Sequence, residues 1–455
     1  MKITAFFLMA IVSVTTFAAD IEWSGLYRIE GVSLQNPDLT NPSRSISYGL
    51  QHLIMRPKII ASDGITIRSQ FDIFNNKAFP NSHLGQTWGG DVREAGTFAG
   101  SANDSNVMSR NGRAGTLQVS QLYLTWDHEY GSLLAGRAPL QFGLGMKYSA
   151  GMGLFDHWYD NLDMVGYKLV YGNLFVLPMI GKSSGGQPNR SDDVNDYLLQ
   201  AQYESPEGDI EMGAMFHIRH AGEQGSDVPV NSHYTGGGAD GDVFFGDDAI
   251  PSGASIQTSN LYVLKDTPTL RLGGEAAFQQ GHLGVKTAGG EDVTVGGFGI
   301  ATELEYRPSE SNWKWGLKTG IATGDDPNTN AKFEGFIFNR NYDVAFLMFN
   351  HPLGQYDIFR TRMIGGGGGI PNNDPKFVNA TPNVNREINH PDVDAISNVF
   401  YMAPYTIYRM GDRWNMKGVL ATGYLNVDPI ANSVSKSVGF EFDYSINYMP
   451  RKGVM

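Results

Sequence analysis

Two short motifs in this sequence have the residue types and spacing of catalytic or nucleotide-binding sites. Gly181 to Gly185 match the G-x-S-x-G pattern of hydrolases, in which a strand, a sharp turn and a helix expose the serine. Here a polar loop follows, so we expect no nucleophile at Ser183. Gly236 to Gly241 match G-x-G-x-x-G. No βαβ unit surrounds them, and nearby aspartates such as Asp240 would repel a pyrophosphate.

Two acidic loops carry the oxygen ligands that Ca²⁺ prefers. One contains Asp240 and Asp242, and the other contains Asp325 and Asp326. Neither has the EF-hand spacing, and two solvated acidic loops are the alternative interpretation. The ten histidines include no H-E-x-x-H motif, and the chain has no cysteine to supply a thiolate. We therefore expect no zinc site, no cofactor and no enzymatic activity.

The strongest pattern is an alternation with a period of two residues. From Val438 to Tyr448 every second residue is apolar or aromatic, and those between are small or polar. Residues 65–73, 210–219, 313–321 and 414–424 repeat this pattern, with Met215 as a lapse. This period, over this length, is typical of a tilted strand that crosses a membrane.

Tight turns such as Asp63-Gly64, Gly172-Asn173 and Gly411-Asp412 join the predicted strands in pairs. The other connections are long and polar: 75–114, 143–162, 183–193, 220–254, 281–292, 323–395 and 426–434. Short turns at one end and long loops at the other predict an all-β, transmembrane, antiparallel up-and-down barrel. Sixteen strands are predicted: 21–34, 47–61, 65–75, 116–127, 131–142, 163–171, 174–182, 194–204, 209–220, 255–265, 269–280, 293–306, 312–323, 396–409, 413–425 and 435–448. A hairpin within 334–364 would raise the count to eighteen.

The first residues and the composition indicate where the protein is located and which partners it lacks. Lys2 precedes an apolar stretch that ends at Thr16-Phe17-Ala18, which predicts a signal peptide over residues 1–18. Residues 19–455 then form one barrel domain with long extracellular loops. After residue 18 the longest unbroken apolar run is Val344 to Phe349, too short for a spanning helix. A net charge of -13 argues against a nucleic-acid partner.

With these elements in place, residues 19–455 resemble a Gram-negative outer-membrane porin. The strand ending at Tyr448 resembles the aromatic-ended last strand of such barrels, although Met449 to Met455 follow it. Tyr130 to Arg137 resembles a strand-to-loop segment common in porins. Two further pieces are similar to the alginate-export group of porin-like barrels: Gly320 to Asn328 with Phe333, and Asn398 to Leu425.

If the aromatic rows face lipid, the opposite rows face the lumen. The basic residues of these rows are Arg28, Arg56, Lys58, Arg68, Arg137, Arg219, Arg271, Lys314, Lys318 and Lys417. The acidic ones are Glu22, Glu30, Asp72, Glu204, Glu211, Glu275, Glu303, Glu305, Glu441 and Asp443. Equal numbers argue against an exporter of an acidic polymer, which needs a basic lumen.

Two interpretations of these predicted pore-lining charges stay open. Arg28, Arg56 and Arg68 come from three consecutive strands, and Glu303 and Glu305 come from the far half of the barrel. Opposed walls of charge would create a transverse field at a constriction. Alternatively, the two glutamates form local ion pairs with lysines of the next strand, Lys314 and Lys318.

The expected function is passive diffusion of small hydrophilic solutes through a water-filled pore of the outer membrane. The alternatives are a substrate-specific or gated exporter, which a plugged lumen would favour, a barrel enzyme, and a surface adhesion or structural protein. The expected partners are outer-membrane lipids, lipopolysaccharide and the barrel-assembly machinery. General porins are often trimers, so the resemblance implies a homotrimer.

Overall fold

The computed structural model describes residues 20–37, 39, 45–75, 82–88, 117–184, 194–222, 253–286, 291–326, 329, 331–351, 353, 395–427 and 435–450. The predicted signal peptide and the predicted calcium ligands Asp240 and Asp242 lie outside these residues. Within the described residues no helix has the length and apolar character needed to cross a membrane.

The described residues form one sheet of eighteen strands. Two of them have only two residues each, β4 (Gln86–Thr87) and β15 (Lys332–Phe333). The sixteen longer strands are β1 (Asp20–Gln35), β2 (Ser45–Ser62), β3 (Ile65–Ile73), β5 (Leu117–His128), β6 (Gly131–Pro139), β7 (Asn161–Tyr171), β8 (Leu174–Ser184), β9 (Val194–Glu204), β10 (Ile210–Ala221), β11 (Ser255–Asp266), β12 (Leu270–Lys286), β13 (Asp292–Tyr306), β14 (Trp313–Ala322), β16 (Val399–Met410), β17 (Trp414–Leu425) and β18 (Ser437–Tyr448). Each matches one predicted strand, which confirms the predicted all-β antiparallel fold, and the strand count agrees with the predicted range of sixteen to eighteen.

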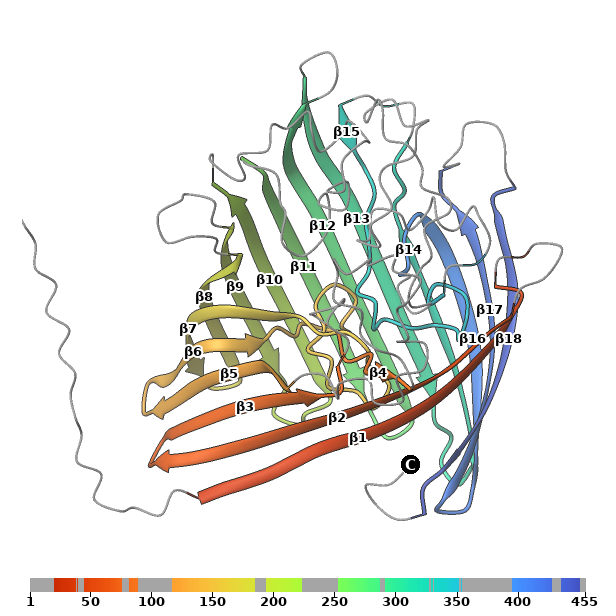
Figure 1. Ribbon diagram of the computed structural model, residues 1–455, viewed down its shortest axis with the longest axis horizontal. Helices are drawn as coiled ribbons and strands as arrows, with labels where there is room; N and C mark the ends of the chain where they lie inside the picture. The colour runs from red at the N-terminus through yellow and green to blue at the C-terminus, as the bar shows by residue number, and fades with distance from the viewer. Residues whose placement is uncertain are drawn as a thin grey trace, which may run out of the picture.

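Each long strand pairs antiparallel with the next long strand along the chain. The sheet curls around a lumen (Figure 1). β1 begins and β18 ends at the end of the short turns, since Asp20 lies opposite Ile60 and Tyr448 lies opposite Trp414. β1 and β18 are the edge strands, and the described residues contain no ladder between them.

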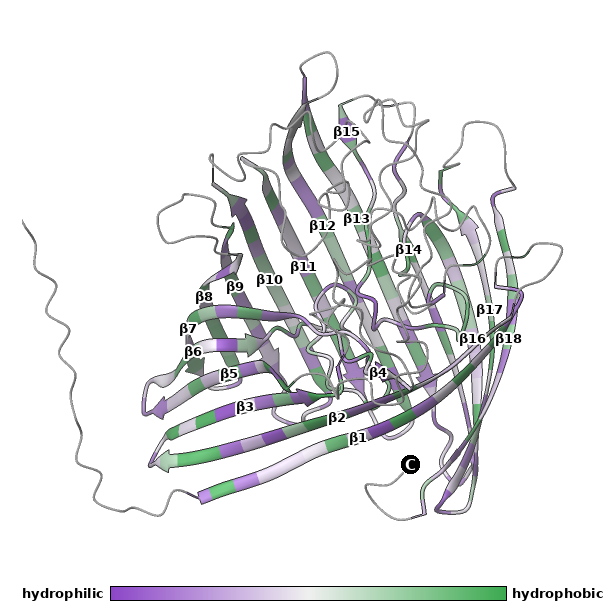
Figure 2. Cartoon of the chain, viewed as in Figure 1, coloured by the Kyte–Doolittle hydropathy of each residue, from purple (hydrophilic) through white to green (hydrophobic). Residues whose placement is uncertain are grey.

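The two faces of the sheet differ as the alternation predicts, and hydropathy alternates along the strands (Figure 2). On the outer face, Trp23 of β1 and Phe278 of β12 are about half exposed, and Phe440 of β18 is 80% exposed. On the inner face, Glu275 and Ala277 of β12 are buried. Apolar side chains therefore cover the outside of the barrel, where lipid would lie.

One predicted connection is shorter than expected. The sequence predicts a long loop over 281–292, but β12 continues to Lys286 and β13 begins at Asp292. Gly281 and His282 still pair with β13, and a bulge lies between His282 and Lys286. The glycines near this end indicated a loop, although the strand continues there through an irregular ladder.

A charge on the outer face should destabilise the barrel. Ile300 lies near the middle of β13 and faces outward. Ile300→Arg should lower the free energy of unfolding in a bilayer by about 2–4 kcal/mol, because the guanidinium enters hydrocarbon. Gln202→Arg is the matched control, since Gln202 faces inward and donates a hydrogen bond to Glu211. Equal losses in both variants, measured by reversible urea unfolding in vesicles, would contradict the assigned faces.

Candidate functional site

Three connecting segments fold into the lumen instead of extending away from the barrel. They are residues 82–88 after β3, 140–160 after β6 and 331–351 after β14, and we call them together the lumen plug. The 140–160 and 331–351 segments are the yellow and teal loops in the middle of Figure 1. The plug contacts the inner face of the barrel on several sides, so it occupies part of the lumen.

The 140–160 segment spans the lumen from β10 and β12 to β1. At one end the Glu275 carboxylate accepts hydrogen bonds from the backbone N–H of Leu144 (2.8 Å) and Met146 (3.2 Å). At the other end Arg28 of β1 donates to the carbonyl of Asp156 at 3.0 Å. His157 also lies 3.0 Å from Glu30. Charged side chains on opposite sides of the barrel thus hold the backbone of one segment.

The 331–351 segment packs against β13, β14, β16 and β17. Its aromatic side chains are buried together with small residues of the wall, in a cluster of Phe336, Phe338, Tyr342, Phe349, Ala301, Ala322, Ala403 and Ala421. Two carboxylates of β18 bind its backbone. Glu441 accepts from the N–H of Leu347 (2.7 Å) and Met348 (2.6 Å), and Asp443 accepts from that of Phe346 (2.9 Å).

The plug segments also bind one another. The Asn341 amide donates to the Trp158 carbonyl (2.7 Å) and the Ser149 hydroxyl (3.1 Å), and it accepts from the Trp158 N–H (3.0 Å). Asn339 donates to Asp160 at 2.8 Å. The 82–88 segment joins them through a bridge between Ser82 and Trp158. The three segments therefore form one connected body.

A cavity of about 210 Å³ lies between the 140–160 segment and β10, β11 and β12. Its polar lining includes Lys147, Tyr148, Asp160, His217 and Arg219. Burial lowers the pKa of Lys147 to about 8, a shift that Asp160 opposes and Arg219 reinforces. The Lys147 ammonium group in the lining of this cavity therefore loses its charge just above neutral pH.

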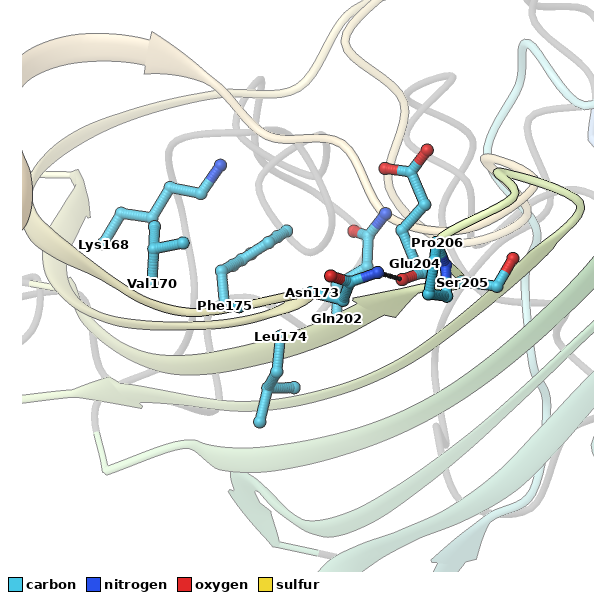
Figure 3. A pocket seen from close by; sticks show the side chains of 10 residues that line it. Lys168, Val170, Asn173, Leu174, Phe175, Gln202, Glu204, Ser205 and Pro206 are labelled. Atoms are coloured by element: carbon cyan, nitrogen blue, oxygen red, sulfur yellow. Dashed lines mark hydrogen bonds between the residues drawn. The ribbon is translucent and has the colours of Figure 1, made fainter.

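A second recess, of about 450 Å³, lies on the inner face at the end of the short turns. Figure 3 shows Lys168, Phe175 and Glu204 on one side of the strands and Leu174 on the other. The Lys168 ammonium lies 4.2 Å from the centre of the Phe175 ring, and Asn173 donates to the Glu204 carbonyl at 2.8 Å. The lining of this recess therefore combines a positive side chain, Lys168, and a negative one, Glu204, with apolar residues such as Phe175.

The predicted pore-lining charges mostly lie on the inner face, where many have close partners. Of the two interpretations given above, local ion pairing holds for the two glutamates of β13. Glu303 lies 3.1 Å from both Lys318 and Arg271, and Glu305 lies 3.4 Å from Lys314. The other inner-face charges have these partners: Arg28 with the plug backbone, Arg56 with Gln70, Lys58 with Glu22, Lys417 with the Tyr405 ring, and Glu441 and Asp443 with the 331–351 segment. Arg68, also on the inner face, is exposed.

Arg137 is the exception, and its prediction as a pore-lining residue is wrong. It pairs in register with Leu122, an exposed outer-face residue, and with Asp163 of β7. The guanidinium and the Asp163 carboxylate form two hydrogen bonds of 2.7 Å on the outer face. The reason is that β6 has no aromatic residue and carries both Leu133 and Leu134, so its sequence does not reveal which row faces lipid.

The structure brings together a cluster that the sequence analysis missed. His52 of β2, Asp72 of β3 and His83 of the 82–88 segment meet on the inner face, and all are buried. Ser120 of β5 donates a hydrogen bond to the same carboxylate. A serine hydrolase needs its serine bonded to an imidazole, and Ser120 is bonded to the carboxylate instead. The predicted calcium ligand Asp325 accepts the Glu334 N–H at 2.8 Å, a structural contact within a loop.

Comparison with known proteins adds the following findings. No family model and no curated protein matches the chain. It is similar to solved structures of a loop-deletion mutant of OmpT, an outer membrane protein of Vibrio cholerae (8% identity, TM-score 0.43, 95% of this chain and 99% of that one), and of an anion-selective porin from Comamonas acidovorans (9%, 0.43, 94% and 98%). The outer membrane channel DcaP of Acinetobacter baumannii is also similar (8%, 0.42, 94% and 95%).

The strands themselves define the fold. Sixteen long antiparallel strands in up-and-down order, an apolar outer face, a charged inner face and short turns at one end give this chain the architecture of a transmembrane β-barrel. Barrels of this architecture are typical of the outer membrane of Gram-negative bacteria.

The contact between two plug segments can be tested by cross-linking, because the chain has no native cysteine. The Asn341 amide lies 3.1 Å from the Ser149 hydroxyl. Ser149→Cys with Asn341→Cys should form a disulfide under mild oxidation, which a mobility shift on a non-reducing gel would reveal. Ser149→Cys with Ser311→Cys is the control, since Ser311 lies in a short turn. Cross-linking no faster than in the control would contradict the plug.

Proposed function

We propose that the protein is an outer-membrane channel for small hydrophilic solutes, whose lumen is narrowed by the plug. The observation that carries this proposal is the contrast between an apolar outer face and an inner face that carries many polar and ionisable side chains. Such an inner face supports water and polar solutes, whereas lipid covers the outside. The recess and the cavity leave unfilled space along the inner face.

The plug favours a selective or gated channel over a wide general pore. An unobstructed barrel of sixteen strands leaves an aqueous channel. Here the plug is bound by charge-assisted hydrogen bonds at Glu275, Glu441 and Asp443. The alternative, a substrate-specific exporter, would need a ligand to release these contacts. The homotrimer and the partners lipopolysaccharide and barrel-assembly machinery stay predictions from the sequence.

Single-channel recording in planar bilayers tests the proposal. The wild type should pass a small ionic current. The double variant Glu441→Ala, Asp443→Ala removes the acceptors of three plug N–H groups, each bond contributing about 1.5–3 kcal/mol. Its conductance should rise at least about twofold, because a loss of this size shifts the plug equilibrium by more than tenfold.

The control double variant is Glu22→Ala, Asp127→Ala, which removes the same charge from the end of the barrel away from the plug. It should leave the conductance unchanged. An increase in both double variants would mean that charge alone sets the current. No current from either protein, correctly folded, would refute the channel. A current only after a solute is added would favour the exporter.

Lys147 should make ion selectivity depend on pH. Because burial lowers its pKa to about 8, the ammonium is charged below that pH and neutral above it. Anion preference, measured as the reversal potential in a salt gradient, should therefore decrease between pH 6.5 and 9.5, the range about 1.5 pH units either side of that pKa. Lys147→Met should remove this step, and Lys182→Met, an exposed lysine of β8, should preserve it. A step that survives in Lys147→Met would assign it to another group.

A further inference from the structure

The cluster of His52, Asp72 and His83 has the composition and spacing of a metal site. The Asp72 Oδ1 atom lies 2.9 Å from His52 Nε2 and 3.0 Å from His83 Nδ1. The three ligand atoms all lie within 4.8 Å of one another. Among the described residues, it is the one group of three or more histidine and carboxylate side chains whose ligand atoms lie this close together.

These ligands suit a first-row transition metal rather than Ca²⁺. Neutral imidazole nitrogens bind Zn²⁺, Cu²⁺ and Ni²⁺, and a carboxylate completes such sites. In a tetrahedral zinc site with bonds of about 2.0–2.1 Å, neighbouring ligand atoms lie roughly 3.3 Å apart. The two observed distances from Asp72 need to widen by only a few tenths of an ångström.

The His52 nitrogen supplies an independent observation. His52 is 2% exposed, and its Nε2 atom, although 2.9 Å from Asp72 Oδ1, forms no well-aligned hydrogen bond. A buried polar atom without a partner is costly. Because this nitrogen and the ligand atoms of Asp72 and His83 lie within 4.8 Å of one another, a cation bound among them would satisfy it.

The surroundings hold the ligands in place. Ser120 and Gln70 both donate to the second carboxylate oxygen of Asp72, Gln70 at 3.2 Å, which leaves Oδ1 toward the imidazoles. Arg28 donates to the backbone carbonyl of His83 and so fixes the 82–88 segment. Outer contacts of this kind orient metal ligands. One neighbour opposes a cation: Arg56 donates to Gln70 at 2.7 Å and brings a positive charge near.

We propose that His52, Asp72 and His83 bind a divalent transition-metal ion of the zinc class on the inner face of the barrel. The ion would join β2 and β3 to the 82–88 segment. That segment contacts the 140–160 segment through Ser82 and through the His83 N–H, which lies 2.5 Å from the carbonyl oxygen of His157. Metal binding would therefore stabilise the plug against the wall.

Isothermal titration of the metal-free full chain in detergent with Zn²⁺ tests the site directly. The wild type should bind one ion, and His52→Gln and His83→Gln should each weaken binding by at least about tenfold, as losses around metal sites typically do. His128→Gln is the matched control, because His128 is exposed at a short turn. Zn²⁺ should also raise the melting temperature of the wild type and the control, but not of the two variants.

Equal Zn²⁺ affinity in all four proteins, or no binding by the wild type, would overturn the proposal. If a variant fails to fold, zinc-edge X-ray absorption of the wild type still decides. A ligand set with two imidazoles supports the site, and a set of oxygens alone refutes it. The effect on the plug rests on the proposed function, but the titration does not. A protein that binds Zn²⁺ as described and passes no current under any condition would refute the channel and leave the site.

Discussion

Every backbone N–H and C=O group within the hydrocarbon of a membrane must find its partner inside the protein. The antiparallel ladders meet this requirement for the strands between the two edges, β1 and β18. They also force side chains to alternate between lipid and lumen, so each strand supplies one apolar row and one row free to carry charge. Because the ladders use only backbone groups, the inner-row side chains remain available for other contacts. The carboxylates that bind the plug are such side chains.

The plug applies the same requirement to backbone that is not in a strand. Segments inside the lumen carry N–H groups that the ladders cannot reach, and Glu275, Glu441 and Asp443 accept hydrogen bonds from several of them. A carboxylate can accept several such bonds and makes each one stronger than a neutral acceptor would. Several charges predicted to face the lumen, namely Arg28, Glu275, Glu441 and Asp443, therefore bind the backbone of the plug.

The wall could be predicted from the sequence because alternation is local. The predictions failed where the structure does not follow local alternation. In β6, Leu133 and Leu134 leave the facing ambiguous, so Arg137 was assigned to the wrong side. Between β3 and β5 a register shift at Gln70 and Phe71 buries neighbouring residues together, which no regular pattern anticipates. The plug rests on contacts between distant segments. Its signals were the apolar run from Val344 to Phe349 and the small residues on the inner rows of β13, β14, β16 and β17.

The separation of these contacts along the chain has a consequence for assembly. Asn341 and Ser149 lie 192 positions apart, and Arg28 and Asp156 lie 128 apart. Contacts of such long range form slowly, because the intervening chain must first be ordered. The strands between them supply that order. The long-range contacts of the plug thus depend on the wall, whereas the ladders between neighbouring strands need no contact from the plug.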